Sequence, residues 1–150
     1  MRWKVEDMKK ILDMQDYIDT VIYPVCVSHV PWDKKSIAEP FWVEKVSAAA
    51  EQQLTGRVLL FQTLSAVWHD QYIDTTFPYV MQNLEALRGG FPYCLVVTNA
   101  EELAAKLREA NVEAYVVRAV PEAAVQSKNF LEKSLVEGNR IVQKIISVWN

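Results

Sequence analysis

The sequence predicts an α/β fold: a single three-layer αβα domain over residues 1–150, with a four-stranded, mostly parallel sheet. Two short apolar runs at residues 58–61 (VLLF) and 93–98 (YCLVVT) lead to this prediction, because strands covered on both faces are apolar without alternation. Amphipathic segments lie before, between and after these runs. Strands that alternate with helices indicate parallel pairing through right-handed crossovers.

The first half of the chain predicts two helices and two strands. Residues 5–18 carry apolar side chains at helical spacing, and residues 21–27 are a β-branched strand. Pro24 lies inside that strand and has no N–H to donate, which indicates a bulge or an edge position. After a polar loop at 28–39, a second helix is expected to begin at Pro40 and to end at Gly56, directly before the strand at 58–61.

The second half continues the alternation. Residues 65–76 have no clear period and are expected to form a long loop, after which Pro78 opens a third helix. The strand at 93–98 is followed by a helix that Asn99 caps and Asn111 ends, then by a strand at 113–120 and a helical region from Pro121 to the end, where Gly138 is a weak point. We expect the strand order 2-1-3-4, a Rossmann- or flavodoxin-like arrangement.

The composition excludes several classes of protein. A content of 51% hydrophobic and 23% charged residues is globular, and a net charge of −3 without a basic stripe argues against nucleic-acid binding. No signal peptide is expected, and no apolar run approaches the ~20 residues of a membrane span. Cys26 and Cys94 form no CxxC pair and are expected to be reduced neighbours on adjacent strands, which favours a cytoplasmic protein.

Polar side chains are expected to converge at the carboxyl ends of the strands, where open α/β sheets bind ligands. We call these six candidates the rim residues: His29, Thr63, His69, Asp70, Asn99 and Arg118. The two histidines with an aspartate suit a metal or an acid–base pair, but surface or backbone-bonded histidines are more common. No GxSxG, GxGxxG or Walker motif is present, so we predict no catalytic residue, no metal site and no cofactor.

Aromatic side chains indicate a different kind of site. Trp32 and Trp68 fall in or beside the expected rim loops, and Trp149 ends a helix with near-heptad spacing. Exposed tryptophans are enriched at protein interfaces, although core packing is the more common role. The last helix equally fits a dimer surface or a cover for the sheet.

The chain resembles a known family in its first 61 residues. The features are the opening Arg2-Trp3, the phrase at residues 17–20 (YIDT) and the phrase at residues 54–58 (LTGRV). These resemble the uncharacterised YpiF-like family of Bacillus-type Firmicutes, while residues 62–68 depart from its pattern. The resemblance implies a cytoplasmic protein of a Gram-positive bacterium and no particular reaction.

Two hypotheses for function follow. The first is a non-enzymatic interaction or adaptor module that binds a protein partner, or a second copy, through its aromatic-rich loops or last helix. The second is a small-molecule binder or enzyme that uses the rim residues. A flat apolar patch around Trp32 and Trp68 would favour the first, and a ligand-sized pocket would favour the second.

Overall fold

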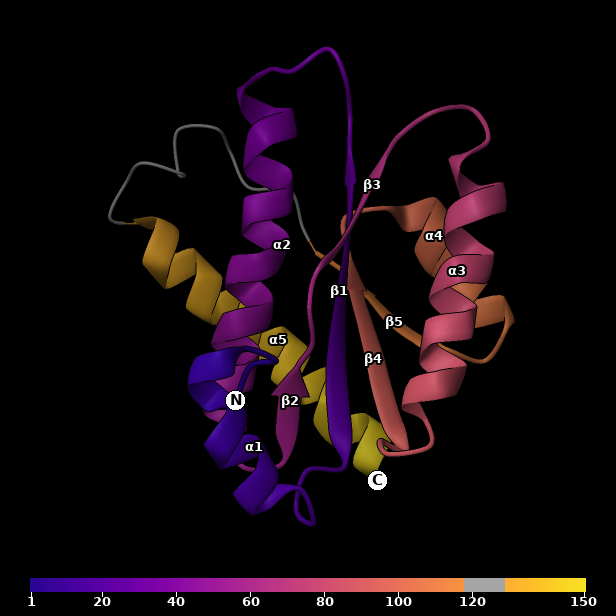
Figure 1. The fold of residues 1–150 in the computed structure, drawn as a ribbon. Helices are drawn as coiled ribbons and strands as arrows, with labels where there is room; N and C mark the ends of the chain where they lie inside the picture. Colours follow the sequence, from indigo (N-terminus) through magenta and orange to yellow (C-terminus); the bar gives the residue numbers. More distant parts are fainter. Residues whose placement is uncertain (118–128) are drawn as a thin grey trace.

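The fold is a three-layer αβα structure around a parallel sheet, seen in a computed structural model that describes residues 1–117 and 129–150 (Figure 1). The sheet has five strands in the order β2-β1-β4-β5, with β3 also paired to β1. Every pairing is parallel. The strands are β1 (Thr20–Ser28), β2 (Val58–Leu60), β3 (Leu64–Val67), β4 (Tyr93–Thr98) and β5 (Glu113–Val116). The predicted order is therefore confirmed for the four expected strands, and β3 is the strand that the sequence analysis missed.

Helices cover both faces of the sheet and bury a separate apolar cluster on each. The helices are α1 (Met8–Met14), α2 (Lys34–Gln53), α3 (Tyr72–Leu87), α4 (Glu101–Glu109) and α5 (Asn129–Trp149). On one face α2 and α5 pack on Ile22 and Leu95; on the other, α3 and α4 pack on Val21 and Val96. Figure 1 shows α2 to the left of the sheet and α3 and α4 to the right.

The two cysteines are free and lie on adjacent strands, as predicted. They face opposite layers: Cys26 belongs to the cluster under α2 and α5, and Cys94 to the cluster under α3 and α4.

The predicted bulge at Pro24 is present, and it explains why β2 and β3 are separate. Ile22 pairs with Leu60 and Val25 pairs with Leu64, so two residues of β1 (23 and 24) lie opposite three residues of the partner (61–63). The carbonyl of Ile22 accepts the N–H of Phe61 at 3.0 Å, so the backbone nitrogen of Pro24, two residues later, also faces the β2–β3 segment. Proline has no N–H to donate there, and this is the place where the β2–β3 segment carries its extra residue.

Two helix starts were predicted wrongly. The second and third helices were expected to begin at Pro40 and Pro78, but α2 begins at Lys34 and α3 at Tyr72, so each proline lies in the second turn. Each proline removes the hydrogen bond to the carbonyl four residues earlier, which belongs to Ser36 or Asp74. Asp74 is exposed and Ser36 is partly exposed, so water can reach the freed carbonyls.

The expected long loop at residues 65–76 was also wrong. It contains β3 and the first turns of α3, which leaves only residues 68–71 between the two elements.

The ends of the later elements agree in part with the sequence analysis. Asn111 follows α4 with a positive φ of 59°, as expected of a residue that ends a helix. The strand predicted at 113–120 is seen to Val116, and α5 begins at Asn129; the remaining predictions for this part of the chain lie outside the described residues.

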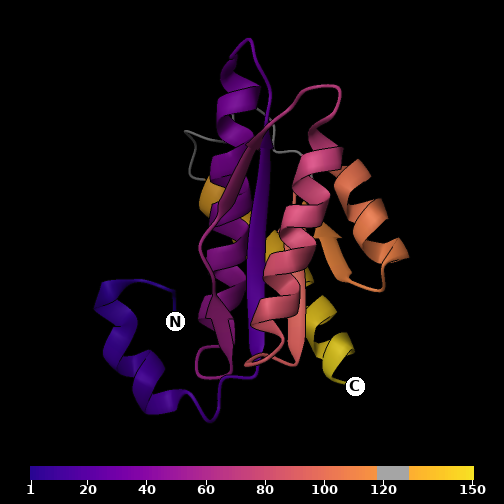
Figure 2. The same cartoon turned by 45° about the vertical axis from the view of Figure 1, so that its right-hand side comes forward.

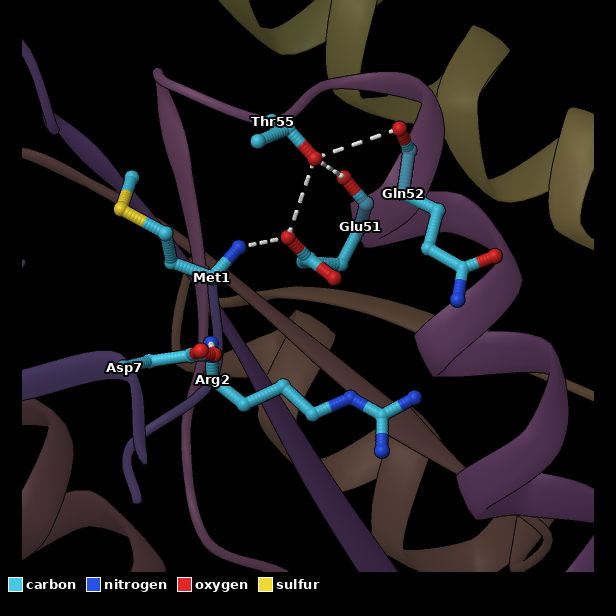
Figure 3. A network of polar contacts seen from close by, with 6 residues as sticks. All are labelled: Met1, Arg2, Asp7, Glu51, Gln52 and Thr55. Carbon is cyan, nitrogen blue, oxygen red and sulfur yellow. Dashed lines mark hydrogen bonds and ion pairs between the residues drawn. The ribbon is translucent and has the colours of Figure 1, made fainter. Parts of the chain in front are cut away.

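The N-terminal segment closes one half of a sheet edge. The N–H of Trp3 donates to the carbonyl of Leu60 and the N–H of Leu60 donates to the carbonyl of Met1, both at 2.9 Å. The amine of Met1 forms a buried ion pair with Glu51, and Thr55 donates to the same carboxylate at 3.3 Å (Figure 3). These contacts hold Met1–Trp3 beside β2, where Arg2 and Leu60 form an isolated parallel bridge.

The predicted helix at residues 5–18 is shorter than expected. A 3-10 turn at Val5–Asp7 leads into α1, which lies at the outer edge of the sheet beyond β2 (Figure 2). Ile11 and Met14 contact a small cluster around Leu59, whereas Met8 and Leu12 are exposed.

Candidate functional site

The carboxyl ends of β1 and β3 bring both histidines to one end of the sheet, as the rim hypothesis expected. Val67 pairs with Ser28, and the N–H of Trp68 donates to the carbonyl of Ser28 at 2.7 Å. His29 directly follows β1, and its ring stacks on Trp68 with centroids 5.7 Å apart and an interplanar angle of 20°. His69 follows Trp68, and its Nδ1 accepts the N–H of Gln71 at 3.3 Å.

Asn99 is at this end too, but it does not cap the following helix. The N-cap of α4 is Ala100, and no side chain caps that helix. The Asn99 amide instead pairs with the backbone of Val27: its Oδ1 accepts from the N–H and its Nδ2 donates to the carbonyl, both at 2.8 Å. Asn99 thus continues the β1–β4 ladder by one step beyond the end of β4.

Glu39 completes this arrangement. The Asn99 Nδ2 also donates to Glu39 Oε2 at 3.1 Å, so Asn99 connects α2 to the ends of β1 and β4. The strand order reverses between β1 and β4, and this is the point at which doubly wound sheets bind their ligands. In this protein the Asn99 side chain occupies it.

Of the other rim residues, Thr63 lies away from its predicted position, whereas Asp70 lies where it was expected. Thr63 lies in the bulge beside the middle of β1, between Leu60 and Leu64, the partners of Ile22 and Val25. It is not at the end of the sheet, because β3 follows it and continues along β1 to Ser28. Asp70 is exposed in the turn before α3, at the same end as the histidines. Arg118 lies outside the described residues.

A shallow polar cavity of about 230 Å³ lies under His29. Its other walls come from the start of α2: Asp33, Lys35, Ser36 and Glu39. Asp33 caps α2 by accepting the Ser36 N–H at 2.7 Å, and this bond together with the Ser36 hydroxyl lowers the pKa of the Asp33 carboxyl. No group of three His, Cys, Asp or Glu side chains within residues 1–117 and 129–150 is close enough to hold a metal ion.

Exposed apolar side chains follow the carboxyl ends of β1 and β3, and we call them together the aromatic surface. Trp32 is 76% exposed and Trp68 is 42% exposed. Val30, at 55%, belongs to the same loop as Trp32, and Val67, at 57%, ends β3 directly before Trp68. The two loops begin side by side, because β1 and β3 are paired up to their last residues, and then lead to opposite faces of the sheet (Figure 1).

Trp149 lies at the opposite end of the sheet from the other two tryptophans singled out in the sequence. Its Nε1 donates to Thr20 Oγ1 at 2.8 Å, and the Arg57 guanidinium lies 3.6 Å from the centre of its ring. Trp149 therefore joins the end of α5 to the start of β1, and it shares no surface with Trp32 and Trp68.

The sequence analysis missed two features of the site. Glu39 and Asp33 were assigned to a polar loop, although the Asp33–Ser36 spacing is itself a helix-start signal. The strand β3 was missed because its four residues, LSAV, are short and mixed in polarity.

Comparison with known proteins supplies the family. A family described as "Protein of unknown function (DUF2487)" matches residues 9–149. The chain belongs to this family. It is also similar to the "Uncharacterized protein YpiF" of Bacillus subtilis (strain 168), with 32% identity over 106 residues that cover 67% of each chain. No solved structure matches. The resemblance to a YpiF-like family is therefore confirmed.

Membership of the DUF2487 family brings no reaction, ligand or partner with it. Across the described parts of the chain, no helix is both long and apolar enough to cross a membrane.

Proposed function

We propose that this protein is a non-enzymatic interaction module that binds a protein partner through the aromatic surface. The observation that carries the proposal is the high exposure of Trp32 and Trp68, together with Val30 and Val67, at the ends of two paired strands. Clustered exposed apolar side chains mark interaction sites more often than scattered ones do, and tryptophan contributes strongly to binding at the centre of interfaces.

The pairing of the two loops supports the proposal. Trp68 is held by its backbone bond to Ser28 and by its stacking on His29. A side chain that is already ordered loses less conformational entropy when a partner covers it.

The alternative, a small-molecule site formed by the rim residues, has less support. The cavity under His29 measures about 230 Å³, below the ~300–1,000 Å³ of most ligand pockets. The side chain of Asn99, with its bonds to Val27 and Glu39, occupies the position where a ligand of a doubly wound sheet would sit.

Site-specific photo-crosslinking in cells tests the proposal. The photoreactive residue p-benzoylphenylalanine would replace Trp32, or Tyr79 as the matched control, in protein expressed in the organism that encodes this chain. Tyr79 is an aromatic residue of comparable exposure, 52%, and lies on α3, away from the aromatic surface. We expect a discrete adduct from position 32 and none from position 79.

A second substitution makes the test specific for the surface. Trp68→Ala should reduce the yield of the adduct from position 32 roughly tenfold or more, as is usual for an aromatic residue central to an interface. The same adducts from both positions, or no adduct from position 32, would contradict the proposal. An adduct with the mass of two copies of this chain would identify the partner as a second copy.

A further inference from the structure

The strand β3 forms an edge of the sheet whose outer side is open. β3 pairs with β1, and no other strand of the described chain pairs with it. Trp68 donates its N–H inward, to Ser28, and the peptide groups of a strand alternate in direction. The backbone N–H and C=O groups of Leu64 and Ala66 therefore also point toward β1, whereas those of Ser65 and Val67 point away from β1, to the open side. The side chains of Ser65 and Val67 are also exposed.

The part of the same edge that β2 forms is already covered by the N-terminal segment. The backbone N–H and C=O groups of Leu60 point away from β1, where the carbonyl of Met1 and the N–H of Trp3 bond to them. This added segment runs parallel to β2 and then turns away into the 3-10 turn at Val5–Asp7. One half of the edge is thus paired by the N-terminal segment, and the half formed by β3 has no partner among residues 1–117 and 129–150.

We propose that an extended segment of a protein partner adds to the sheet as a new strand beside β3. The proposal rests on the proposed function, because Val67 and Trp68 belong to the aromatic surface, and it specifies the conformation of the partner. A row of alternating outward donors and acceptors is matched by the backbone of an extended chain, as in other cases of strand addition.

The surroundings of the edge indicate which side chains the partner carries. Successive side chains of an added strand point to opposite faces of the sheet. At the bulge the edge meets a cavity of about 220 Å³ lined by Trp3, Pro24, Phe61 and Thr63 among others. A mainly apolar groove of about 420 Å³ lies beyond it, lined by Trp3, Lys4, Val5, Met8, Ile11, Leu12 and Gln62. A partner with apolar side chains at alternate positions fits these cavities and the exposed Val67.

A random heptapeptide library displayed on phage provides the probe, with the whole chain as the target. Backbone amide hydrogen exchange then locates each enriched peptide. We expect the amides of Ser65 and Val67 to exchange rapidly in the free protein and to become protected in the complex, because the peptide backbone accepts their hydrogen bonds.

Proline substitutions test the backbone bonds directly. Val67→Pro and Ser65→Pro each remove one outward donor but no bond to β1, so both variants should keep the fold. Each should weaken peptide binding about tenfold or more. Val67→Ala and Ser65→Ala retain the N–H and are the matched controls, and Ser65→Ala should bind as the unchanged protein does.

Three outcomes would overturn the proposal: no enriched peptide that protects Ser65 and Val67, unchanged binding by both proline variants, or protection that rises with protein concentration in the absence of peptide. The last would assign the edge to a second copy. The two proposals can fail separately. A crosslink from position 32 without protection at Ser65 and Val67 retains the interaction module and removes the added strand. Protection of these amides without a crosslink retains binding at the β3 edge and removes Trp32 from the binding surface.

Discussion

Gly138→Ala is predicted to destabilise the protein, although alanine is the better helix former. Gly138 lies in α5 against α2, where a Cβ would stand 2.9 Å from the Cβ of Ala49, 3.2 Å from the backbone nitrogen of Ala50 and 3.3 Å from the backbone carbon of Ala49. Ordinary contacts begin near 3.4 Å, so the helices must separate by about 0.5 Å. Two of the three atoms are backbone, which a change of side-chain rotamer cannot move.

The expected magnitude is a balance of two terms. Replacing glycine by alanine within a helix gains about 1 kcal/mol, and overpacking a core costs about 1–3 kcal/mol. Separation of α2 and α5 also loosens the fully buried Val46 and Ile141 between them. The two terms leave a net loss of about 0–2 kcal/mol of unfolding free energy, and the loosened contacts move the expected value to about 1–2 kcal/mol, which lowers Tm by about 2–8 °C for a domain of this size.

Urea unfolding followed by circular dichroism measures this difference. Gly90→Ala is the matched control, because a Cβ there meets no atom within 4 Å and the backbone needs no positive φ; this variant should be unchanged or slightly more stable. Combining Gly138→Ala with Ala49→Gly removes the nearest clash and should recover part of the loss. A Gly138→Ala protein as stable as the original would refute the argument.

Three further substitutions or modifications test other parts of the structure. Asn99→Asp exchanges two donated hydrogen bonds for a carboxylate facing another carboxylate and a carbonyl, so urea unfolding should show a loss of about 2–4 kcal/mol at pH 7. The loss should be smaller at pH 5, because the new carboxyl has a raised folded pKa and protonation relieves the repulsion; equal losses would contradict this. Burial raises the pKa of the Cys26 thiol to about 12 and that of Cys94 to about 11, so Ellman's reagent should react slowly with the native protein and rapidly in guanidinium chloride; rapid reaction in native buffer would count against burial. Burial acts to raise the pKa of Asp19, but hydrogen bonds from Arg57 and Thr20 outweigh burial, and the net pKa is lowered. The stability that ionised Asp19 adds is therefore fully present above its ordinary pKa of 3.8. It is lost as the pH falls through the lowered pKa of the folded protein. Asp19→Asn should therefore cost up to about 1 kcal/mol at pH 7 and less at pH 3, whereas the exposed Asp16→Asn should cost little at either pH, and a pH-independent cost at Asp19 would be inconsistent with the pair.

The candidate site was predictable only in part. That His29 and His69 lie at one end of the sheet followed from their positions after two parallel strands. The role of Asn99 did not follow, because its partner Val27 is 72 residues away and the same residue type also suits a helix cap. Thr63 was misplaced for a related reason: the sequence analysis ended the edge strand where the bulge begins.

By itself the sequence determined the fold class and the four main strands, and it favoured the order that the structure then established. Continuous apolar runs specify buried strands, and helices between them leave few possible topologies. Gly138 could be recognised only as a weak point in a helix, and Pro40 and Pro78 only as signals for a helix start. The tertiary structure decided that Gly138 permits the close approach of α2 and α5, and that both prolines lie inside helices. It also decided which half of the β2–β3 edge stays open. These outcomes depend on contacts between segments distant in sequence, which local pattern and propensity do not encode.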